Sequence, residues 1–334
     1  MISRFSPGAM GLLAPIQVLL DDDQISEILI NRPQEVFFEK SGKLKAFAVP
    51  ELTERHLFHI FQLIASENEQ IFDEEHPLLS ASLSDGSRVQ LVLPPTSVFP
   101  TLSIRRKIVK NFVLEDYEKT DFFNHAKGFS FKESLEDLPE EERSLVQLYH
   151  DNNWLEFIKK AISIKKTIVI SGGTSTGKTT FLNACLNYID HEQRIIILED
   201  TREIDISHPN KVQLLASKGG QSKAKVTMQD LVQCCLRLRP DRIICGEIRG
   251  KEILDFLAAS STGHEGSMTS IHANNPTIAF MRMTQMYKLN NVPSMTDEDI
   301  LRELKAVIDV IVQITKSPKG RHVQSVYYKY KHLM

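Results

Sequence analysis

The spacing of apolar residues changes near residue 144, and this change divides the chain. Before it, short runs alternate between apolar and polar residues, which predicts half-buried β-strands. The pattern recurs in residues 25–47, 87–93 and 101–105. In residues 54–69 the apolar residues recur three and four positions apart, which predicts one helix with Thr53 as its N-cap. The first part is therefore expected to be a small α+β unit.

After residue 144, apolar β-branched runs alternate with helical patterns. Buried strands are expected at 167–170, 194–198, 242–245 and 267–271, with terminal strands at 308–314 and 322–330. Helices are expected at 145–162, 180–186, 228–238, 248–260, 279–287 and 297–306. Strands and helices that alternate in this way predict an α/β fold, in which helices cover both faces of a mostly parallel sheet.

These patterns predict two domains and a connection between them. We expect an α+β domain over residues 1–110, a linker over 111–143 and a larger α/β domain over 144–334. The linker carries aromatic residues and an acidic cluster, so it is interpreted as a partly helical segment packed on a neighbour or as a solvated acidic loop. The uncharged run at 5–20 is interrupted by proline and glycine. It is expected to pack within the first domain, with membrane-surface contact as the alternative.

The strongest motif follows the predicted strand at 167–170. Its residues are Gly172, Gly173, Thr174, Ser175, Thr176, Gly177, Lys178, Thr179 and Thr180. They match G-x-x-x-x-G-K-[ST] between a strand and a helix, the context in which this pattern binds phosphate. Lys178 is expected to reach the β- and γ-phosphates and the Thr179 hydroxyl to hold Mg²⁺. ATP and Mg²⁺ are therefore the predicted cofactors, and a glycine turn that binds nothing is the alternative.

Polar residues end three further strands of the predicted sheet, namely Glu199 and Asp200, Glu247, and His272. Ligands gather at the carboxyl ends of parallel strands, so these side chains are expected near the phosphate loop. Glu247 is predicted to polarise the attacking water. Glu199 or Asp200 is predicted to hold Mg²⁺, partly through water, and His272 to contact the γ-phosphate. Capping of the following turn or helix is the alternative for each carboxylate, and a structural role is the alternative for His272.

Two arginines of the first domain complete the predicted catalytic set. Arg88 and Arg105 fall on the polar faces of two neighbouring strands, and they share one face if these strands form a hairpin. A nucleotide bound between the domains would make them arginine fingers, which stabilise charge on the transferred phosphoryl group. An exposed sheet face is the alternative.

Composition narrows the class of protein. The 334 residues are 42% hydrophobic and 25% charged, with a net charge of −3, so no nucleic-acid groove is evident. The four cysteines lie in apolar segments without metal-ligand spacing and are expected to be reduced thiols of a cytosolic protein.

Residues 316–334 carry five Lys and Arg and no acid. A solvated terminal strand is favoured there over weak contact with anionic lipid. We expect no membrane-spanning segment.

Four motifs occur in the order found in one family. They are the phosphate loop at 172–179, an Asp box at 195–203, a Walker B region at 236–249 and a His box at 261–273. With them, the chain resembles the traffic ATPases of type IV secretion systems, a family that includes type II secretion and type IV pilus motors. Residues 85–90 and 102–105 match the family as well, which favours both arginines. The compact length favours the type IV secretion branch.

The resemblance implies a homohexamer of RecA-like ATPase domains, a second ring of PAS-like N-terminal domains, and nucleotide bound between the two. It implies ATP hydrolysis that energises secretion at the cytoplasmic face of the inner membrane, with other secretion-system components as partners. A pilus motor, a nucleotide-gated scaffold with little turnover, and a RecA-like nucleic-acid motor are the alternatives. Ser175 departs from the family, which usually has glycine there, and a positive φ would strain a serine.

Overall fold

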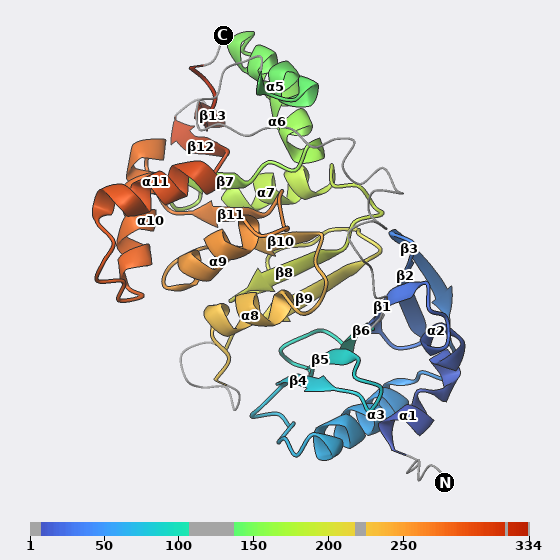
Figure 1. The fold of residues 1–334 in the computed structure, drawn as a ribbon. Helices are drawn as coiled ribbons and strands as arrows, with labels where there is room; N and C mark the ends of the chain where they lie inside the picture. The colour runs from blue at the N-terminus through green and yellow to red at the C-terminus, as the bar shows by residue number, and fades with distance from the viewer. Residues whose placement is uncertain (1–7, 107–136, 218–224, 318–319, 333–334) are drawn as a thin grey trace, which may run out of the picture.

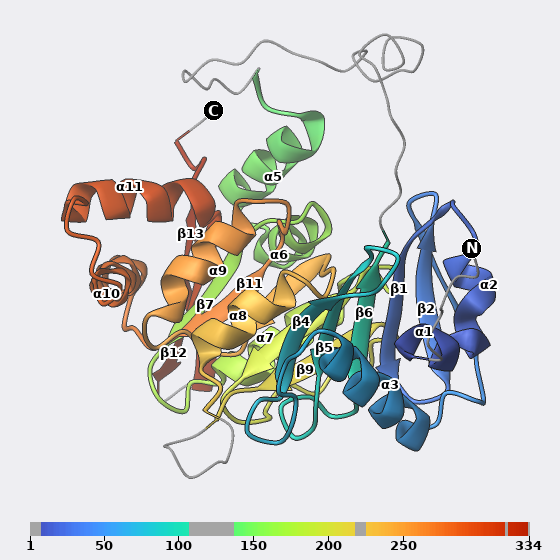
Figure 2. The same cartoon turned by 60° about the horizontal axis from the view of Figure 1, so that its bottom comes forward.

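The computed structural model describes residues 8–106, 137–217, 225–317 and 320–332. The chain builds two sheets, and each has its own helices (Figures 1 and 2). Within the described residues, the N-terminal sheet has six strands and the C-terminal sheet has seven. No helix in these ranges has both the length and the apolar character needed to cross a membrane.

The N-terminal sheet is antiparallel, with strand order β3-β2-β1-β6-β5-β4. Its strands are β1 (Ile25–Arg32), β2 (Glu35–Lys40), β3 (Lys43–Ala48), β4 (Leu78–Ser82), β5 (Arg88–Val92) and β6 (Thr101–Arg105). Its helical segments are α1 (Ala9–Leu12), the 3₁₀ turn η1 (Ala14–Ile16), α2 (Gln17–Leu20) and α3 (Glu54–Glu67). The predicted N-cap of α3 is confirmed, because the Thr53 hydroxyl accepts the backbone N–H of His56. The prediction missed β4.

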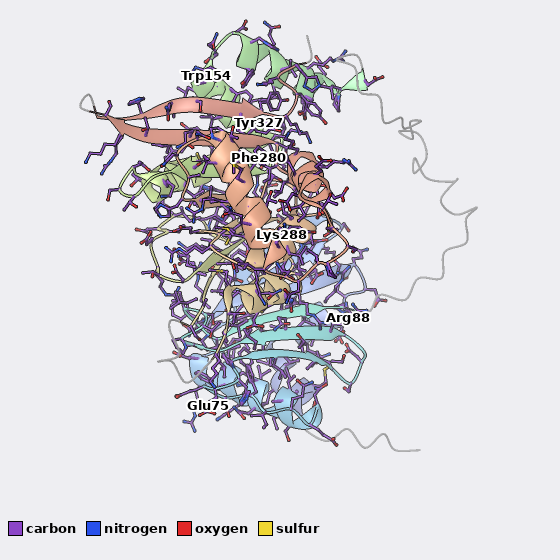
Figure 3. The ribbon with its side chains drawn as sticks, turned by 90° about the vertical axis from the view of Figure 1, so that its left-hand side faces the viewer. Glu75, Arg88, Trp154, Phe280, Lys288 and Tyr327 are labelled. Atoms are coloured by element: carbon purple, nitrogen blue, oxygen red, sulfur yellow. The ribbon has the colours of Figure 1, made fainter. Side chains whose placement is uncertain are left out.

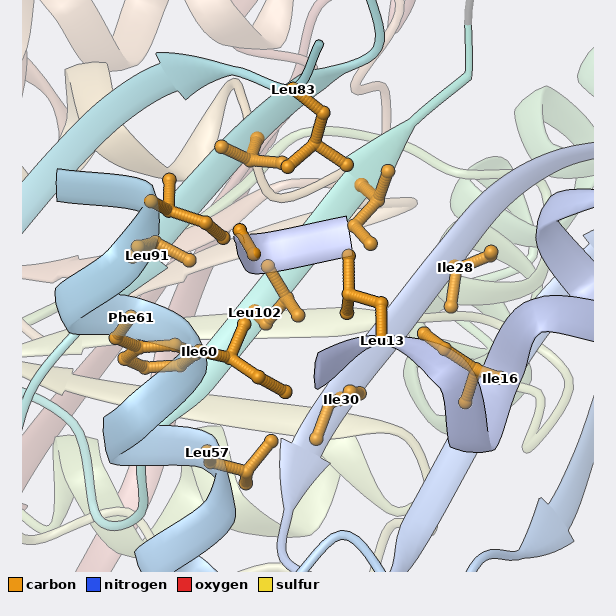
Figure 4. Close-up of a cluster of buried hydrophobic side chains, with 14 of the residues drawn as sticks. Leu13, Ile16, Ile28, Ile30, Leu57, Ile60, Phe61, Leu83, Leu91 and Leu102 are labelled. Carbon is orange, nitrogen blue, oxygen red and sulfur yellow. The ribbon is translucent and has the colours of Figure 1, made fainter. Parts of the chain in front are cut away.

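The helical segments cover one face of this sheet (Figure 4). The fully buried residues there include Leu13, Ile16, Ile28, Ile30, Leu57, Ile60, Phe61, Leu91 and Leu102. Because residues 8–20 supply Ala9, Leu13 and Ile16 to this core, the prediction that the N-terminal run packs within the first domain is confirmed for its described part. Residues 5–7 lie outside the described ranges.

The C-terminal sheet has strand order β13-β12-β7-β11-β10-β8-β9, and every pair is parallel except β12 with β13. Its strands are β7 (Ile168–Gly172), β8 (Ile195–Glu199), β9 (Lys211–Leu215), β10 (Arg242–Cys245), β11 (Met268–Ile271), β12 (Val310–Ser317) and β13 (Gly320–Tyr328). Its helices are α5 (Glu140–His150), α6 (Trp154–Ser163), α7 (Lys178–Leu186), α8 (Met228–Cys235), α9 (Glu252–Ser260), α10 (Pro276–Lys288) and α11 (Asp297–Val307). The predicted mostly parallel sheet is confirmed.

Helices bury both faces of this sheet, which explains why its strands are continuous apolar runs. Ile168 and Ile170 of β7 pack toward α5, α6 and α7, whereas Val169 packs toward α9, α10 and α11. On the second side, Phe280 of α10 contacts Tyr327 of β13 with ring centroids 5.0 Å apart (Figure 3). The four cysteines are buried and form no disulfide, as expected.

The prediction of one helix over 145–162 is wrong, since α5 and α6 are separate helices. Asn152, between them, has a φ of 55°, in the left-handed region that does not continue an α-helix. Helix α5 also begins at Glu140, so the expected boundary at residue 144 falls within it. Three glutamates in its first turn favour a helix N-terminus. The rest of the expected linker, 111–136, lies outside the described residues.

The polar face of the N-terminal sheet contacts the C-terminal part of the chain. Asn31 of β1 donates to the side-chain oxygen of Asn210 (2.9 Å), and the fully buried Arg194 donates to the side-chain oxygen of Asn31 (2.5 Å). Burial lowers the pKa of Arg194 to about 9. An ion pair between Glu39 and Arg239 joins the same two surfaces. Such buried polar contacts require mutual positioning to satisfy each group, so they fix how the two parts meet.

Candidate functional site

The backbone of the phosphate loop needs small residues at two positions. A side chain on Gly172 would place its Cβ 2.8 Å from the carbonyl oxygen of Ile314, and Gly177 has a φ of +90°. Ser175 has a φ of 59°, so the positive φ considered from the sequence is present, and serine carries the corresponding strain. The loop therefore keeps its shape although a non-glycine residue stands at a left-handed position.

Lys178 begins α7 and lies against the loop. Its side-chain nitrogen is 3.1 Å from the carbonyl oxygen of Gly173, and the Thr176 hydroxyl donates to the same oxygen (2.9 Å). Only 8% of Lys178 is exposed. Burial lowers the pKa of this lysine, while the Glu247 carboxylate opposes that shift. The ammonium group is thus held beside the loop that would surround a phosphate.

The strand ends converge on the loop, as expected for a parallel sheet. A cavity of about 590 Å³ is lined by the loop residues 174–180 together with Glu199, Asp200, Glu203, Glu247, Arg249, His272 and Arg321. The structure therefore brings together every predicted site residue of the second domain except Gly172 and Gly173, which do not line the cavity.

A chain of contacts links the catalytic candidates across this cavity. The Glu247 carboxylate lies 3.3 Å from His272 Nε2 and accepts a hydrogen bond from Arg249 (2.7 Å). Arg249 also pairs with Asp200 (2.6 Å), and the Glu247 contact raises the pKa of Arg249. His272 has its Nδ1 3.3 Å from the nitrogen of Lys178. Burial lowers the pKa of His272, and a neutral ring with its proton on Nε2 satisfies both neighbours.

Glu199 is turned partly away from the Mg²⁺-binding role predicted for it. Its Oε1 accepts the backbone N–H groups of Glu203 and Ile204, both at 2.7 Å, which is the capping role considered as the alternative. Its Oε2 is buried and has no hydrogen-bond partner among the described residues. Burial raises the pKa of Glu199. One oxygen of this carboxylate is thus structural, and the other has no partner among the described residues.

Oxygen donors of the kind that Mg²⁺ prefers lie beside the loop. The Thr179 hydroxyl donates to Glu203 (3.1 Å), and Glu199, whose Oε2 has no hydrogen-bond partner among the described residues, is another residue that lines the cavity. Within the described residues, no group of three or more His, Cys, Asp and Glu side chains is arranged to hold a metal ion. Mg²⁺ is usually bound by one or two protein oxygens plus substrate phosphates, so these donors fit it.

Known proteins identify the family. The family described as "Type II/IV secretion system protein" matches residues 140–329, more than half of the chain. The chain belongs to this family. The type IV secretion system protein VirB11 of Brucella suis is 35% identical over 325 residues, which cover 95% of this chain and 89% of that protein. VirB11 of Bartonella henselae is 34% identical, with coverage of 95% and 91%.

A solved structure confirms the fold class of this secretion ATPase. The crystal structure of the VirB11 ATPase from the Brucella suis type IV secretion system, in complex with sulphate, matches with a TM-score of 0.90 at 33% identity. The match covers 97% of this chain and 98% of that one. The chain is thus an ATP-hydrolysing secretion ATPase. A RecA-like domain follows a smaller N-terminal domain along the sequence, as the resemblance implied.

The two arginines predicted as fingers lie elsewhere in this secretion ATPase. Arg88 and Arg105 are directly opposite each other on β5 and β6, so the predicted hairpin is confirmed; Arg88 is labelled on this sheet in Figure 3. They line a separate hollow of about 150 Å³ together with Glu27, Val89, Leu236, Arg237 and Arg239. Neither lines the cavity at the phosphate loop. Within one chain, the structure does not bring them to the other catalytic candidates.

Three charged residues of the cavity were not singled out from the sequence, namely Glu203, Arg249 and Arg321. Glu203 and Arg249 fall inside motifs that match the family, so their positions gave a signal, but their contacts with Thr179 and Glu247 depend on the fold. Arg321 had no such signal. It lies on β13, and its Nε donates to the carbonyl oxygen of Ser175 at 3.2 Å.

Proposed function

We propose that this chain hydrolyses ATP with Mg²⁺ as a homohexameric ring motor that energises type IV secretion. The observation that carries the proposal is the cavity in which the phosphate loop faces Glu247 and His272. Likeness to VirB11 over 95% of the chain supports the assignment to type IV secretion. A pilus motor would share the catalytic residues, but the Brucella suis and Bartonella henselae relatives, at 35% and 34% identity, are type IV secretion proteins.

The positions of the residues around the cavity suggest a role for each of them. Backbone N–H groups of residues 173–179 and the N-terminus of α7 bind the phosphates. Lys178 neutralises charge on the β- and γ-phosphates. Glu247, across the cavity, accepts a hydrogen bond from the attacking water and orients it toward the γ-phosphorus. His272, between Lys178 and Glu247, holds that carboxylate and contacts the γ-phosphate.

Thr179 would hold the Mg²⁺ ion, with the free oxygen of Glu199 and the carboxylates of Glu203 and Asp200 reaching it through water. The ion neutralises negative charge on the phosphates. Thr179 exchanges its present hydrogen bond to Glu203 for this contact. Because Asp200 is paired with Arg249 and Glu199 caps a turn, neither is placed as a direct ligand.

Arg88 and Arg105 would act on the nucleotide of another copy of the chain. Both are separated from their own phosphate loop, and the side chain of Arg105 is 74% exposed. A head-to-tail ring would bring this arginine-lined hollow to the cavity of a neighbour. Arginine fingers supplied from a second molecule stabilise charge on the transferred phosphoryl group. This arrangement keeps the predicted role of both arginines and makes the ring part of the active site.

We place the ring at the cytoplasmic face of the inner membrane, in contact with other components of the secretion system, on the basis of the type IV secretion relatives. Contact with anionic lipid through residues 316–334 is not part of this proposal. Two of the cations that suggested it have other partners, since Lys329 pairs with Asp309 (2.7 Å) and Arg321 lies at the phosphate loop.

Light scattering combined with an ATPase assay tests the proposal. With Mg²⁺ and a non-hydrolysable ATP analogue, we expect a mass six times the 38.0 kDa of the chain, and turnover that requires Mg²⁺. Lys178→Ala should abolish nucleotide binding, because the main cation of the site is lost. A chain that binds ATP but stays monomeric and does not hydrolyse it would contradict the motor and favour the nucleotide-gated scaffold.

A further inference from the structure

Arg321 reaches the phosphate loop from the side opposite to the catalytic strands. It lies on β13, and the strand order places β12 and β13 on one side of β7, with β11 and β10 on the other. Its Nε donates to the carbonyl oxygen of Ser175, and its Cδ would be 3.4 Å from a Cβ on Gly177. The side chain therefore lies along the rim of the loop, in the same cavity as Lys178.

The positive charge of Arg321 is not neutralised by any residue that the structure describes. Arg249, the other arginine of this cavity, is paired with both Glu247 and Asp200. For Arg321, the described ranges give one hydrogen bond, to a neutral carbonyl, and no ion pair. A guanidinium group has several N–H donors in a planar fork that matches phosphate oxygens. Most of these donors remain available at the edge of the loop.

The contact also falls at the one strained residue of the loop. Ser175 adopts a φ of 59° without being glycine, and its carbonyl group is the one that Arg321 binds. A hydrogen bond from a charged donor fixes the orientation of that peptide. Arg321 thus supports the loop where serine makes the backbone conformation less favourable.

We propose that Arg321 is a nucleotide-binding residue of this ATPase: its Nε holds the Ser175 carbonyl, and its remaining N–H groups bind phosphate oxygens of the nucleotide. This inference rests on the proposed function of the cavity and adds a residue to it. It makes the β12–β13 hairpin part of the nucleotide site, on the side of the loop that Glu247 and His272 do not reach.

Affinity measurements on Arg321→Gln test this role, with Mg·ATP and inorganic tripolyphosphate as the two probes. Loss of a charge-assisted contact should weaken both about tenfold. The difference from the wild type should shrink at high salt, because the contact is exposed to solvent. Arg321→Lys should recover part of the affinity by keeping the charge. Lys316→Gln is the matched control. Lys316 pairs with Arg321 across the hairpin but does not line the cavity, so this variant should bind both probes as tightly as the wild type.

The same measurements in a Ser175→Gly background separate phosphate binding from loop support. If Arg321 binds phosphate, Arg321→Gln still weakens tripolyphosphate when glycine has removed the strain. Two results would overturn the inference. In one, Arg321→Gln no longer weakens tripolyphosphate binding in the Ser175→Gly background. In the other, Arg321→Gln weakens ATP binding but leaves tripolyphosphate binding unchanged. Lys178→Ala is measured alongside. If Lys178→Ala loses binding while Arg321→Gln binds like the wild type, only this inference fails; if the wild type binds no ATP, the proposed function fails.

Discussion

His272 Nε2 lies 3.3 Å from the Glu247 carboxylate, and this contact joins the ends of two neighbouring strands, β11 and β10. The side-chain nitrogen of Lys178 lies 3.3 Å from Nδ1 and 3.4 Å from Nε2 of the same ring. The histidine therefore connects Lys178, which we propose to bind the phosphates, with Glu247, which we propose to orient water. A change at the γ-phosphate would therefore alter the contacts of both Lys178 and Glu247. This would couple the ends of β10 and β11 to hydrolysis.

Glu247→Gln should preserve ATP binding and remove most of the turnover. Glutamine has nearly the same shape and can still contact His272 and Arg249, but it is a poor acceptor for the proton of the attacking water. General-base assistance contributes about 10²–10⁴-fold, so kcat should fall by at least about a hundredfold. Single-turnover hydrolysis and nucleotide affinity measure the two effects separately. Glu298→Gln, an exposed change on α11, is the control; normal turnover by Glu247→Gln would disprove the assignment.

Turnover should fall in acid because of His272. Burial lowers the pKa of this side chain below its usual 6.5, so the neutral ring persists until the pH falls below that value. Protonation then removes the acceptor for Lys178 and places two cations side by side. In the wild type, kcat should therefore decrease at low pH. In His272→Asn, this decrease should be absent, because asparagine does not titrate. A profile unchanged by His272→Asn would show that another group titrates.

Glu27 should make stability depend on pH in the opposite direction. Burial raises its pKa to about 7, against the favourable charges of Arg105 and Arg239. A raised carboxyl pKa means that the fold prefers the protonated form, so the stability it contributes is present below about pH 4.5 and is lost as the pH rises through about 7. Glu27→Gln should therefore gain up to about 3 kcal/mol relative to the wild type above pH 7.

Urea unfolding at pH 5 and pH 8 measures this gain. The stability difference between Glu27→Gln and the wild type should grow between the two values, while the exposed Glu51→Gln should show no such growth. An equal difference at both pH values would mean that Glu27 is ionised in the fold throughout, with its arginine neighbours outweighing its burial.

The sequence was informative where one local pattern decides the structure. The strand Arg242–Cys245 was predicted with its observed bounds, because an apolar run lies between Pro240 and Gly246. It was less informative where a single backbone angle or a distant residue decides. Asn152 splits the helix predicted over 145–162 through its positive φ. The half-polar strand β9, Lys211–Leu215, was missed because its alternation is short and lies at the sheet edge.

The same limit applies to the site. Convergence of Glu199, Asp200, Glu247 and His272 follows from strand order, so it was predictable. The binding of Glu199 Oε1 to two backbone N–H groups is a local loop contact that no spacing indicates. Arg321 reaches Ser175 from 146 residues along the chain, and only the pairing of β12 between β7 and β13 brings it there.

The separation of Arg88 and Arg105 from the phosphate loop predicts recovery of activity in mixed rings. Lys178→Ala is expected to lose ATP binding but keeps its arginines, whereas the double variant Arg88→Ala/Arg105→Ala should still bind ATP and should lose ~10³-fold or more in turnover. If the arginines serve another copy, equal mixing should restore about a quarter of wild-type turnover, because one head-to-tail contact in four joins an intact loop to intact arginines. ATPase assays on rings mixed by unfolding and refolding measure this recovery of turnover.

Mixing either variant with the triple variant Lys178→Ala/Arg88→Ala/Arg105→Ala is the control and should restore no turnover. Rings shown to contain both variants, yet inactive, would place the arginines at the nucleotide of their own chain.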